Sequence, residues 1–329
     1  IGAFIGPIVA SLARQHDWKY VFYISSAVIL INLVLVILFF KEPEREIKQN
    51  KFSQELKIIF KNIFEALKDM KFVVFLLIIV GFWTMYNQLF YTLPVFIDQW
   101  MDTSIVYNKL HSVWPWLAET IGTPEKTIAA EMLTNLDAMY IIIFQIAVSY
   151  FVMRLKPIHS IISGFLVATI GLFLTFSTNN PMFLFVSILI FGLGEMAGSP
   201  KITEYIGKIA PPNKTALYMG YSFLPMAGGN YLAGILSGSV YQKYSDKISL
   251  LKMEVSNRGL NIPEISENFS QTDYINAACQ QMNMSQGQLT EYLWTNYQPY
   301  NIGIIFAAIG IGTVIAMLLY NWYLNRRKA

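Results

Sequence analysis

The sequence predicts an all-α protein that crosses a membrane several times, and three features support this prediction. First, 54% of its 329 residues are hydrophobic and only 14% are charged, whereas about a quarter of the residues of a soluble domain are charged. Second, the mean hydropathy is +0.43. Third, apolar runs of about 20 residues recur, which is the length needed to cross a hydrocarbon core about 30 Å thick.

Eight apolar segments are expected to be membrane helices. A partial span covers residues 1–13, and full spans are expected at 20–40, 72–97, 132–153, 160–178, 181–207, 214–240 and 299–324. Long outer loops are expected at 98–131 and 241–298. Because the chain begins inside an apolar run and without Met, we expect it to be a fragment.

Lys and Arg residues are distributed unequally between the two sides of the predicted membrane. Alternation of the spans puts sixteen of the 24 on one side, and eight of these lie in residues 41–71. Cytoplasmic loops carry an excess of Lys and Arg. The pattern therefore places segment 41–71 and the C-terminus on the cytoplasmic side of the cell membrane. If the source is bacterial, this is the inner membrane. Helical spacing of apolar residues in 41–71 indicates an amphipathic linker.

Several functions are excluded by composition. The single cysteine, Cys279, cannot form an internal disulfide, and the three histidines fall in connecting segments, so no metal site is predicted. The net charge of +3 and the lack of a base-reading motif argue against nucleic acid. An enzyme is not expected, because no paired acid, His–Cys cluster or nucleophile motif lies within a span.

Glu195 lies inside the apolar span 181–207, and Ser199 follows it one turn later. An ionisable group within a membrane helix is a functional candidate by default. A carboxyl group whose hydration and neighbours change between conformations can bind and release a proton. The alternative is a protonated glutamate with a structural role. Asp137 is interpreted differently, as a helix cap or a group among the lipid headgroups, because it lies near the outer end of its span.

Two other spans, 72–97 and 214–240, carry polar and aromatic side chains. Amides within a membrane cost free energy unless they are hydrogen-bonded, so these groups either join neighbouring helices or line a wet cavity. The residues predicted to bind substrate or protons are Glu195, Trp83, Tyr86, Asn87, Gln88, Tyr91, Ser222 and Asn230.

Glycine and proline interrupt the two spans 181–207 and 214–240. Such breaks are tolerated in lipid where protein or a water-filled cavity satisfies the freed backbone groups. They favour the bending that transporters need, although small residues also let helices pack closely. The expected hinge residues are Gly198, Pro200, Pro225, Gly228 and Gly229.

Several motifs resemble those of a known family. IGAFIGP followed by DWKYVFYISS resembles the fifth and sixth helices of the major facilitator superfamily, whose basic linker joins two six-helix halves. GEMAGSPKITEYIGKIAP, MGYSFLPMAGGNYLAG and FWTMYNQ resemble the tenth, eleventh and seventh helices of its proton-dependent oligopeptide transporters. The resemblance implies that residues 1–40 end the N-terminal bundle, 41–71 form the linker, and 72–329 form the C-terminal six-helix bundle.

What the resemblance implies is a secondary transporter that carries di- or tripeptides, or similar zwitterions, together with protons by alternating access. No cofactor besides the proton gradient is implied. Glu195 takes the family's role of binding peptide and proton. Two positions depart from the pattern: Asn87 stands where relatives often carry an acid, and Ser222 where they often carry Trp. The implied partners are membrane lipids and a small-molecule substrate, expected to be a peptide, and nucleic acid is not among them. The resemblance also implies that helices 1–4, which are missing here, are needed to complete the cavity.

Two other functions stay open. The Gly2, Gly6 and Pro7 pattern resembles the fifth-helix motif of antiporters, which favours an efflux transporter for drugs or metabolites. A membrane scaffold or sensor without a transport cycle is the alternative from another class.

Overall fold

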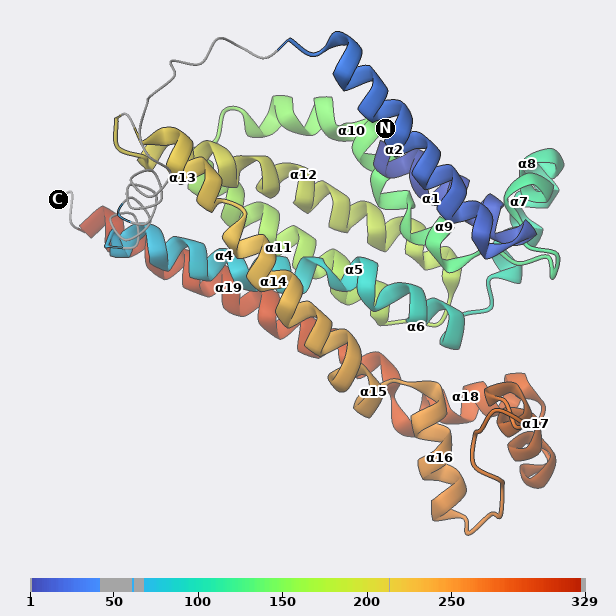
Figure 1. The fold of residues 1–329 in the computed structure, drawn as a ribbon. Helices are drawn as coiled ribbons and strands as arrows, with labels where there is room; N and C mark the ends of the chain where they lie inside the picture. Colours follow the sequence, from blue (N-terminus) through green and yellow to red (C-terminus); the bar gives the residue numbers. More distant parts are fainter. Residues whose placement is uncertain (1, 42–60, 62–67, 213, 327–329) are drawn as a thin grey trace. The chain divides into compact units, whose positions relative to one another are not determined.

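The computed structural model describes residues 2–41, 61, 68–212 and 214–326 (Figure 1). Within these ranges the regular elements are helices, and residue pairs bridge as isolated β-bridges at only two places. The all-α prediction is therefore confirmed. The chain forms two compact units, residues 1–74 and 75–329, which are described separately. Most of the predicted amphipathic linker at 41–71 lies outside the described residues.

The first unit contains helices α1 (Gly2–His16) and α2 (Trp18–Phe39). Asp17 lies between them and caps α2, because its carboxylate accepts a hydrogen bond from the backbone N–H of Lys19 at 3.0 Å. No residue of α2 is buried, although nearly all of its side chains are apolar. A helix that is apolar on every face and uncovered by protein is suited to a lipid environment.

Six helical segments among the described residues are long and apolar enough to cross a membrane. They match the predicted spans closely, and the protein is an integral membrane protein with several spans. The segments are Trp18–Phe39, Met70–Trp100, Ala130–Val152, Pro157–Phe176, Pro181–Ile209 and Pro299–Arg326.

Several of these segments contain more than one helical element, and short helices connect them. The elements are α4 (Met70–Tyr86), α5 (Gln88–Tyr91), α6 (Leu93–Trp100), α7 (Ser104–Val113), α8 (Pro115–Ile121), α9 (Ala130–Thr134), α10 (Leu136–Val152), α11 (Pro157–Phe176), η1 (Pro181–Phe183), α12 (Leu184–Ile209), η3 (Pro299–Asn301) and α19 (Ile302–Arg326).

The predicted span at 214–240 is interrupted, in line with the break expected from its glycine and proline residues. This segment contains α13 (Thr215–Tyr221), α14 (Leu224–Ile235) and a π-helical turn, η2 (Leu236–Val240), which leads into α15 (Tyr241–Tyr244). The break falls at Ser222 and Phe223. Its physical cause is Pro225, which has no backbone N–H to donate to the carbonyl of Tyr221 and therefore begins a new helix.

Helix α11 lies at the centre of the second unit and packs against both α12 and α19. Its contact with α12 is formed by small residues, which we call the glycine seam: Gly164, Ala168 and Gly171 of α11 with Gly194 and Gly198 of α12. A Cβ atom added at Gly164, Gly171 or Gly194 would lie 2.2–2.5 Å from a backbone nitrogen of the other helix. Such close backbone approach is typical of helices that pack in membranes.

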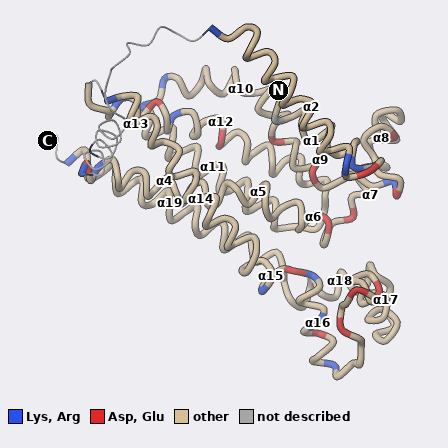
Figure 2. Tube along the Cα trace, in the orientation of Figure 1, with Lys and Arg blue, Asp and Glu red and all other residues tan. Residues whose placement is uncertain are grey.

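Helices α16 (Lys247–Asn257), α17 (Gln271–Met282) and α18 (Gln286–Tyr297) form a segment of the second unit outside the membrane spans. Figure 2 shows many charged residues in this segment and few along the middle of the long helices. Glu254 of α16 accepts hydrogen bonds from Arg258, Tyr292 and Tyr297, the last two at 2.8 and 2.7 Å. Burial raises the pKa of Glu254, but these hydrogen bonds outweigh it and hold the pKa below its ordinary value.

Candidate functional site

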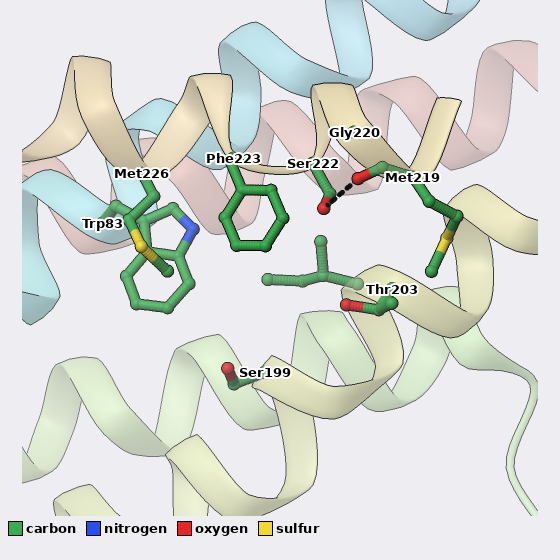
Figure 3. A pocket seen from close by; sticks show the side chains of 9 residues that line it. Trp83, Ser199, Thr203, Met219, Gly220, Ser222, Phe223 and Met226 are labelled. Carbon is green, nitrogen blue, oxygen red and sulfur yellow. Dashed lines mark hydrogen bonds between the residues drawn. The ribbon is translucent and has the colours of Figure 1, made fainter. Parts of the chain in front are cut away.

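A cavity of about 370 Å³ lies between α4, α12, α13 and α14 (Figure 3). This volume falls in the usual range for small-molecule sites. Among the described residues that line it, none has an ionisable side chain. Three carry hydroxyl groups, and the others are apolar. The lining residues are Trp83, Ser199, Ile202, Thr203, Met219, Gly220, Ser222, Phe223 and Met226.

Helix α12 places Glu195 one turn before Ser199 of the cavity wall. The hydroxyl group of Tyr86, on α4, donates a hydrogen bond to Glu195 Oε1 at 2.8 Å. The Tyr86 ring also packs edge-on against the ring of Trp83, with centroids 5.0 Å apart, and Trp83 lines the cavity. Glu195 is therefore connected to the cavity in two ways. One is the backbone of α12, which carries both Glu195 and Ser199, and the other is the contact of Tyr86 with Trp83.

A second carboxyl group, that of Asp137, lies beside Glu195. Asp137 is in the first turn of α10 and only 2% of it is exposed. Its side chain interacts with that of Glu195. The expected position of Asp137 at a helix cap or among headgroups is wrong, because its side chain is buried beside that of Glu195.

The predicted amide residues join helices to one another. Asn87 Nδ2 donates to Asn230 Oδ1 and to the carbonyl of Trp83, both at 2.7 Å. Gln88 is fully buried; its Nε2 donates to the carbonyls of Thr84 and Ala233, and its Oε1 accepts from Thr92. These bonds tie the α4–α5 segment to α14, which is the structural alternative that the sequence left open for these amides.

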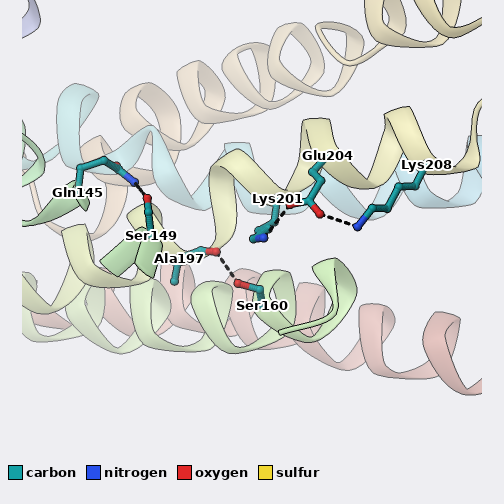
Figure 4. A network of polar contacts seen from close by, with 7 residues as sticks. All are labelled: Gln145, Ser149, Ser160, Ala197, Lys201, Glu204 and Lys208. Carbon is teal, nitrogen blue, oxygen red and sulfur yellow. Dashed lines mark hydrogen bonds and ion pairs between the residues drawn. The ribbon is translucent and has the colours of Figure 1, made fainter. Parts of the chain in front are cut away.

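Polar contacts also hold the far half of α12 (Figure 4). The hydroxyl group of Ser160, on α11, donates to the carbonyl of Ala197 at 2.7 Å. Towards the end of α12, Glu204 forms ion pairs with Lys201 at 2.7 Å and Lys208 at 2.6 Å. The pair with Lys208 is exposed and that with Lys201 is half-buried; ion pairs near the surface contribute little to stability, so we assign them no part in the site.

The sequence also matches a family profile across much of its length. The profile described as Major Facilitator Superfamily matches residues 1–107 and 101–248. The chain belongs to the Major Facilitator Superfamily. The superfamily part of the predicted resemblance is thereby confirmed, and the narrower resemblance to oligopeptide transporters stays a prediction.

Curated relatives of this superfamily member are distant in sequence. It is 23% identical over 246 residues to the multidrug resistance protein MdtH of Aeromonas salmonicida, covering 74% of this chain and 54% of that protein. It is 20% identical over 264 residues to MdtH of Photorhabdus laumondii, covering 80% of this chain and 55% of that protein. The chain thus spans about half the length of the curated relatives it matches.

The structure brings together some of the predicted residues of this superfamily protein and separates others. Tyr86 and Glu195 are hydrogen-bonded, Trp83 and Ser222 line one cavity, and Asn87 bonds Asn230. Tyr91 is exposed and does not line the cavity.

The expected hinge residues occupy tight places. A Cβ atom on Gly229 would lie 2.3 Å from Trp83 Cβ, one on Gly228 3.3 Å from Val80, and one on Gly198 3.2 Å from Phe165. Pro200 lies within the continuous helix α12, and Pro225 in the first turn of α14.

Sequence reasoning missed most of the cavity wall. Thr203, Met219, Phe223 and Met226 line the cavity, but each reads in sequence as an ordinary residue of a membrane helix. A usable signal existed for Thr203, which follows Ser199 by four residues and therefore shares its face of α12.

Proposed function

We propose that the full-length protein is a proton-coupled secondary transporter whose substrates are small amphipathic organic compounds, moved outward in exchange for protons. The observation that carries this proposal is the apolar cavity whose wall residue Trp83 packs on Tyr86, the hydrogen-bond donor to Glu195. The wall of the proposed substrate site is thereby linked through Tyr86 to the carboxyl group of Glu195, and coupling between substrate and proton requires such a link.

The chemistry of the cavity wall supports this class of substrate. The Trp, Phe and Met side chains provide a large apolar surface, and Ser199, Thr203 and Ser222 provide hydroxyl groups for orientation. Methionine side chains adapt to ligands of different shape. The curated relatives are named multidrug resistance proteins, which also supports outward transport of varied compounds.

The second candidate is proton-coupled symport of short peptides, which the motifs around Glu195 and Gly229–Gly234 favour. A zwitterionic peptide carries an ammonium and a carboxylate, and burying each charge is costly without a partner. The described cavity wall offers neither charge. For this reason we place peptide symport second.

Transport by the full-length protein in proteoliposomes separates these candidates. With an inward proton gradient, vesicles are tested for release of a preloaded uncharged lipophilic fluorescent dye and, separately, for uptake of radiolabelled dialanine. We expect proton-driven movement of the dye, abolished by a protonophore and by Glu195→Gln. Peptide uptake without dye movement would favour the second candidate, and insensitivity of both to the protonophore would contradict proton coupling. A membrane scaffold or sensor would move neither.

We also propose that segment 41–71 and the C-terminus lie in the cytoplasm of a cell membrane. The excess of Lys and Arg on that side supports this orientation. Cys279 is the only cysteine in these 329 residues, so in a full-length protein whose cysteines are all replaced, Cys279→Ser included, a single new cysteine can be placed at residue 46 or at Ser266. A membrane-impermeant thiol reagent applied to whole cells should label the second position and not the first; the reverse pattern would invert the topology.

A further inference from the structure

Asp137 is a buried carboxyl group that the proposed function does not use. It is 2% exposed, and its Oδ1 atom has no hydrogen-bond partner among the described residues. Buried polar atoms in folded proteins are almost always hydrogen-bonded. This unpaired oxygen therefore points to an occupant that supplies a donor.

Glu195 presents a second unpaired oxygen at the same place. Its Oε1 accepts the hydrogen bond from Tyr86, whereas its Oε2 is buried and lacks a partner among the described residues. The side chains of Asp137 and Glu195 interact with each other. Gly192, one turn before Glu195, leaves room for the approach, since a Cβ atom there would lie 2.9 Å from Asp137 Oδ1.

The groups around the two acids supply no positive charge. Tyr86 faces them from α4, and Tyr140 of α10 donates its hydroxyl hydrogen to the carbonyl of Phe185 at 2.9 Å. The face of α11 that packs on α12 is the glycine seam, which has no ionisable side chain. Across the part of the chain that the structure describes, no Lys, Arg or His contributes to the electrostatics of this cluster.

Two neighbouring carboxylates repel each other when no cation is present to offset their charges. One proton removes the repulsion, because it leaves a single negative charge. It also converts one carboxyl group into an O–H donor, which can satisfy an unpaired oxygen of the other. The simplest occupant that the geometry calls for is therefore a proton.

We propose that Asp137 and Glu195 form one proton-binding unit, in which the two carboxyl groups share a single proton while α10 and α12 are packed together. Separation of the two helices would split the pair and open it to water. On release, the O–H bond breaks, its electron pair stays on the carboxylate oxygen, and the proton passes to water; nothing is oxidised or reduced. The link from this unit to substrate, through Tyr86 and Trp83, rests on the proposed function.

The sharing of one proton can be measured without any transport assay. A protonated carboxyl group has an infrared C=O band that a carboxylate lacks. The purified full-length protein is titrated in detergent alongside Asp137→Asn, Glu195→Gln and the double variant, whose spectrum serves as the baseline. For the wild type we expect two deprotonation steps more than about one pH unit apart, the behaviour of a coupled pair. Each single variant should show one step, at a pH between the two wild-type steps.

Additive titrations would overturn the proposal. If the two acids are independent, the wild-type curve equals the sum of the two single-variant curves. Asp273→Asn, which alters an exposed acid at the start of α17, is the control and should leave the wild-type steps unchanged. Thermal melting of every variant identifies those that fail to fold.

A variant that keeps both acids covers the case in which the carboxamide variants do not fold. Gly192→Ala places a Cβ atom 2.9 Å from Asp137 Oδ1, which is closer than ordinary contact, so it should push the acids apart and bring the two steps at least threefold closer in proton affinity. Gly234→Ala, with no atom within 4 Å of its added Cβ, is its matched control. Unchanged steps in a folded Gly192→Ala protein would contradict the pair.

Failure of this inference and failure of the proposed function have different signatures. Coupled titration together with transport that ignores the proton gradient would leave the pair standing and refute proton-coupled transport. Additive titration together with proton-driven transport would refute the pair alone.

Discussion

Replacing Gly194 by alanine should force α12 away from α11. In the glycine seam, the added Cβ atom would lie 2.2 Å from the backbone nitrogen of Ala168 and 2.5 Å from the carbonyl oxygen of Gly164. These are backbone atoms, which cannot rotate aside as the end of a side chain can. Ordinary contact begins at 3.4 Å, so relief requires a displacement of 3.4 − 2.2, about 1.2 Å.

The expected cost follows from the same geometry. Overpacking a well-packed interface costs about 1–3 kcal/mol, and the higher helix propensity of alanine returns up to about 1 kcal/mol. We therefore expect a net loss of about 1–2 kcal/mol, which lowers the ratio of folded to unfolded protein about 5–30-fold. Unfolding of the full-length protein in mixed micelles, followed by circular dichroism as denaturing detergent is added, measures this loss.

Gly234→Ala is the matched control for this change. Gly234 also lies within a helix, α14, but its added Cβ atom would meet nothing within 4 Å. It should leave stability unchanged or raise it by up to about 1 kcal/mol. Equal stability of the Gly194→Ala and Gly234→Ala proteins would refute the close backbone contact between α11 and α12.

Three further changes test other parts of the structure. Tyr86→Phe removes the donor to Glu195 Oε1 and should slow proton-driven dye transport about 5–30-fold, as expected from the loss of about 1–2 kcal/mol for a hydrogen bond to a buried acid; Tyr231→Phe, at a residue 72% exposed, should leave it unchanged. Ser222→Trp places an indole in the cavity and should reduce dye transport about tenfold or more; an unaffected rate would mean that the dye binds elsewhere. The folded-state pKa of Glu254 is lowered, so its stabilisation of the α16–α18 segment should be present above the ordinary glutamate pKa of about 4.3 and lost as pH falls below it. Hydrogen exchange of that segment can follow this loss. Glu254→Gln should flatten the pH dependence.

The spans could be predicted from sequence because they depend on a local property. Each needs only a sufficient run of apolar residues, and lipid leaves no alternative to a helix for such a run. An interruption of 214–240 was expected from its glycine and proline residues, and its place at Ser222 and Phe223 follows from Pro225, two residues later. The apolar character of the 214–240 segment is uninterrupted there, and hydropathy alone does not register the missing N–H.

The candidate site could be predicted only in part, because its contacts join distant segments. Tyr86 and Glu195 were both identified as inward-facing groups, but their hydrogen bond spans 109 residues of sequence and depends on the rotation of two helices. Asp137 was misplaced because its depth was judged from the end of the apolar run. The predicted span 132–153 already contained the acid, and what hydropathy could not show is the packing of α10 against α12 that buries Asp137 beside Glu195.

The glycine seam limits how the carboxyl pair can be opened. The backbones of α11 and α12 are in direct contact, and the Ser160 hydroxyl donates to the carbonyl of Ala197. Moving the two helices apart would break both kinds of contact, so we expect them to move as one rigid body. The degree of freedom that separates Asp137 from Glu195 therefore belongs to α10, and the one that separates Tyr86 from Glu195 belongs to α4. Movement of α10 and movement of α4 thus each change one contact of Glu195. Proton occupancy and cavity shape can therefore change one after the other rather than at once.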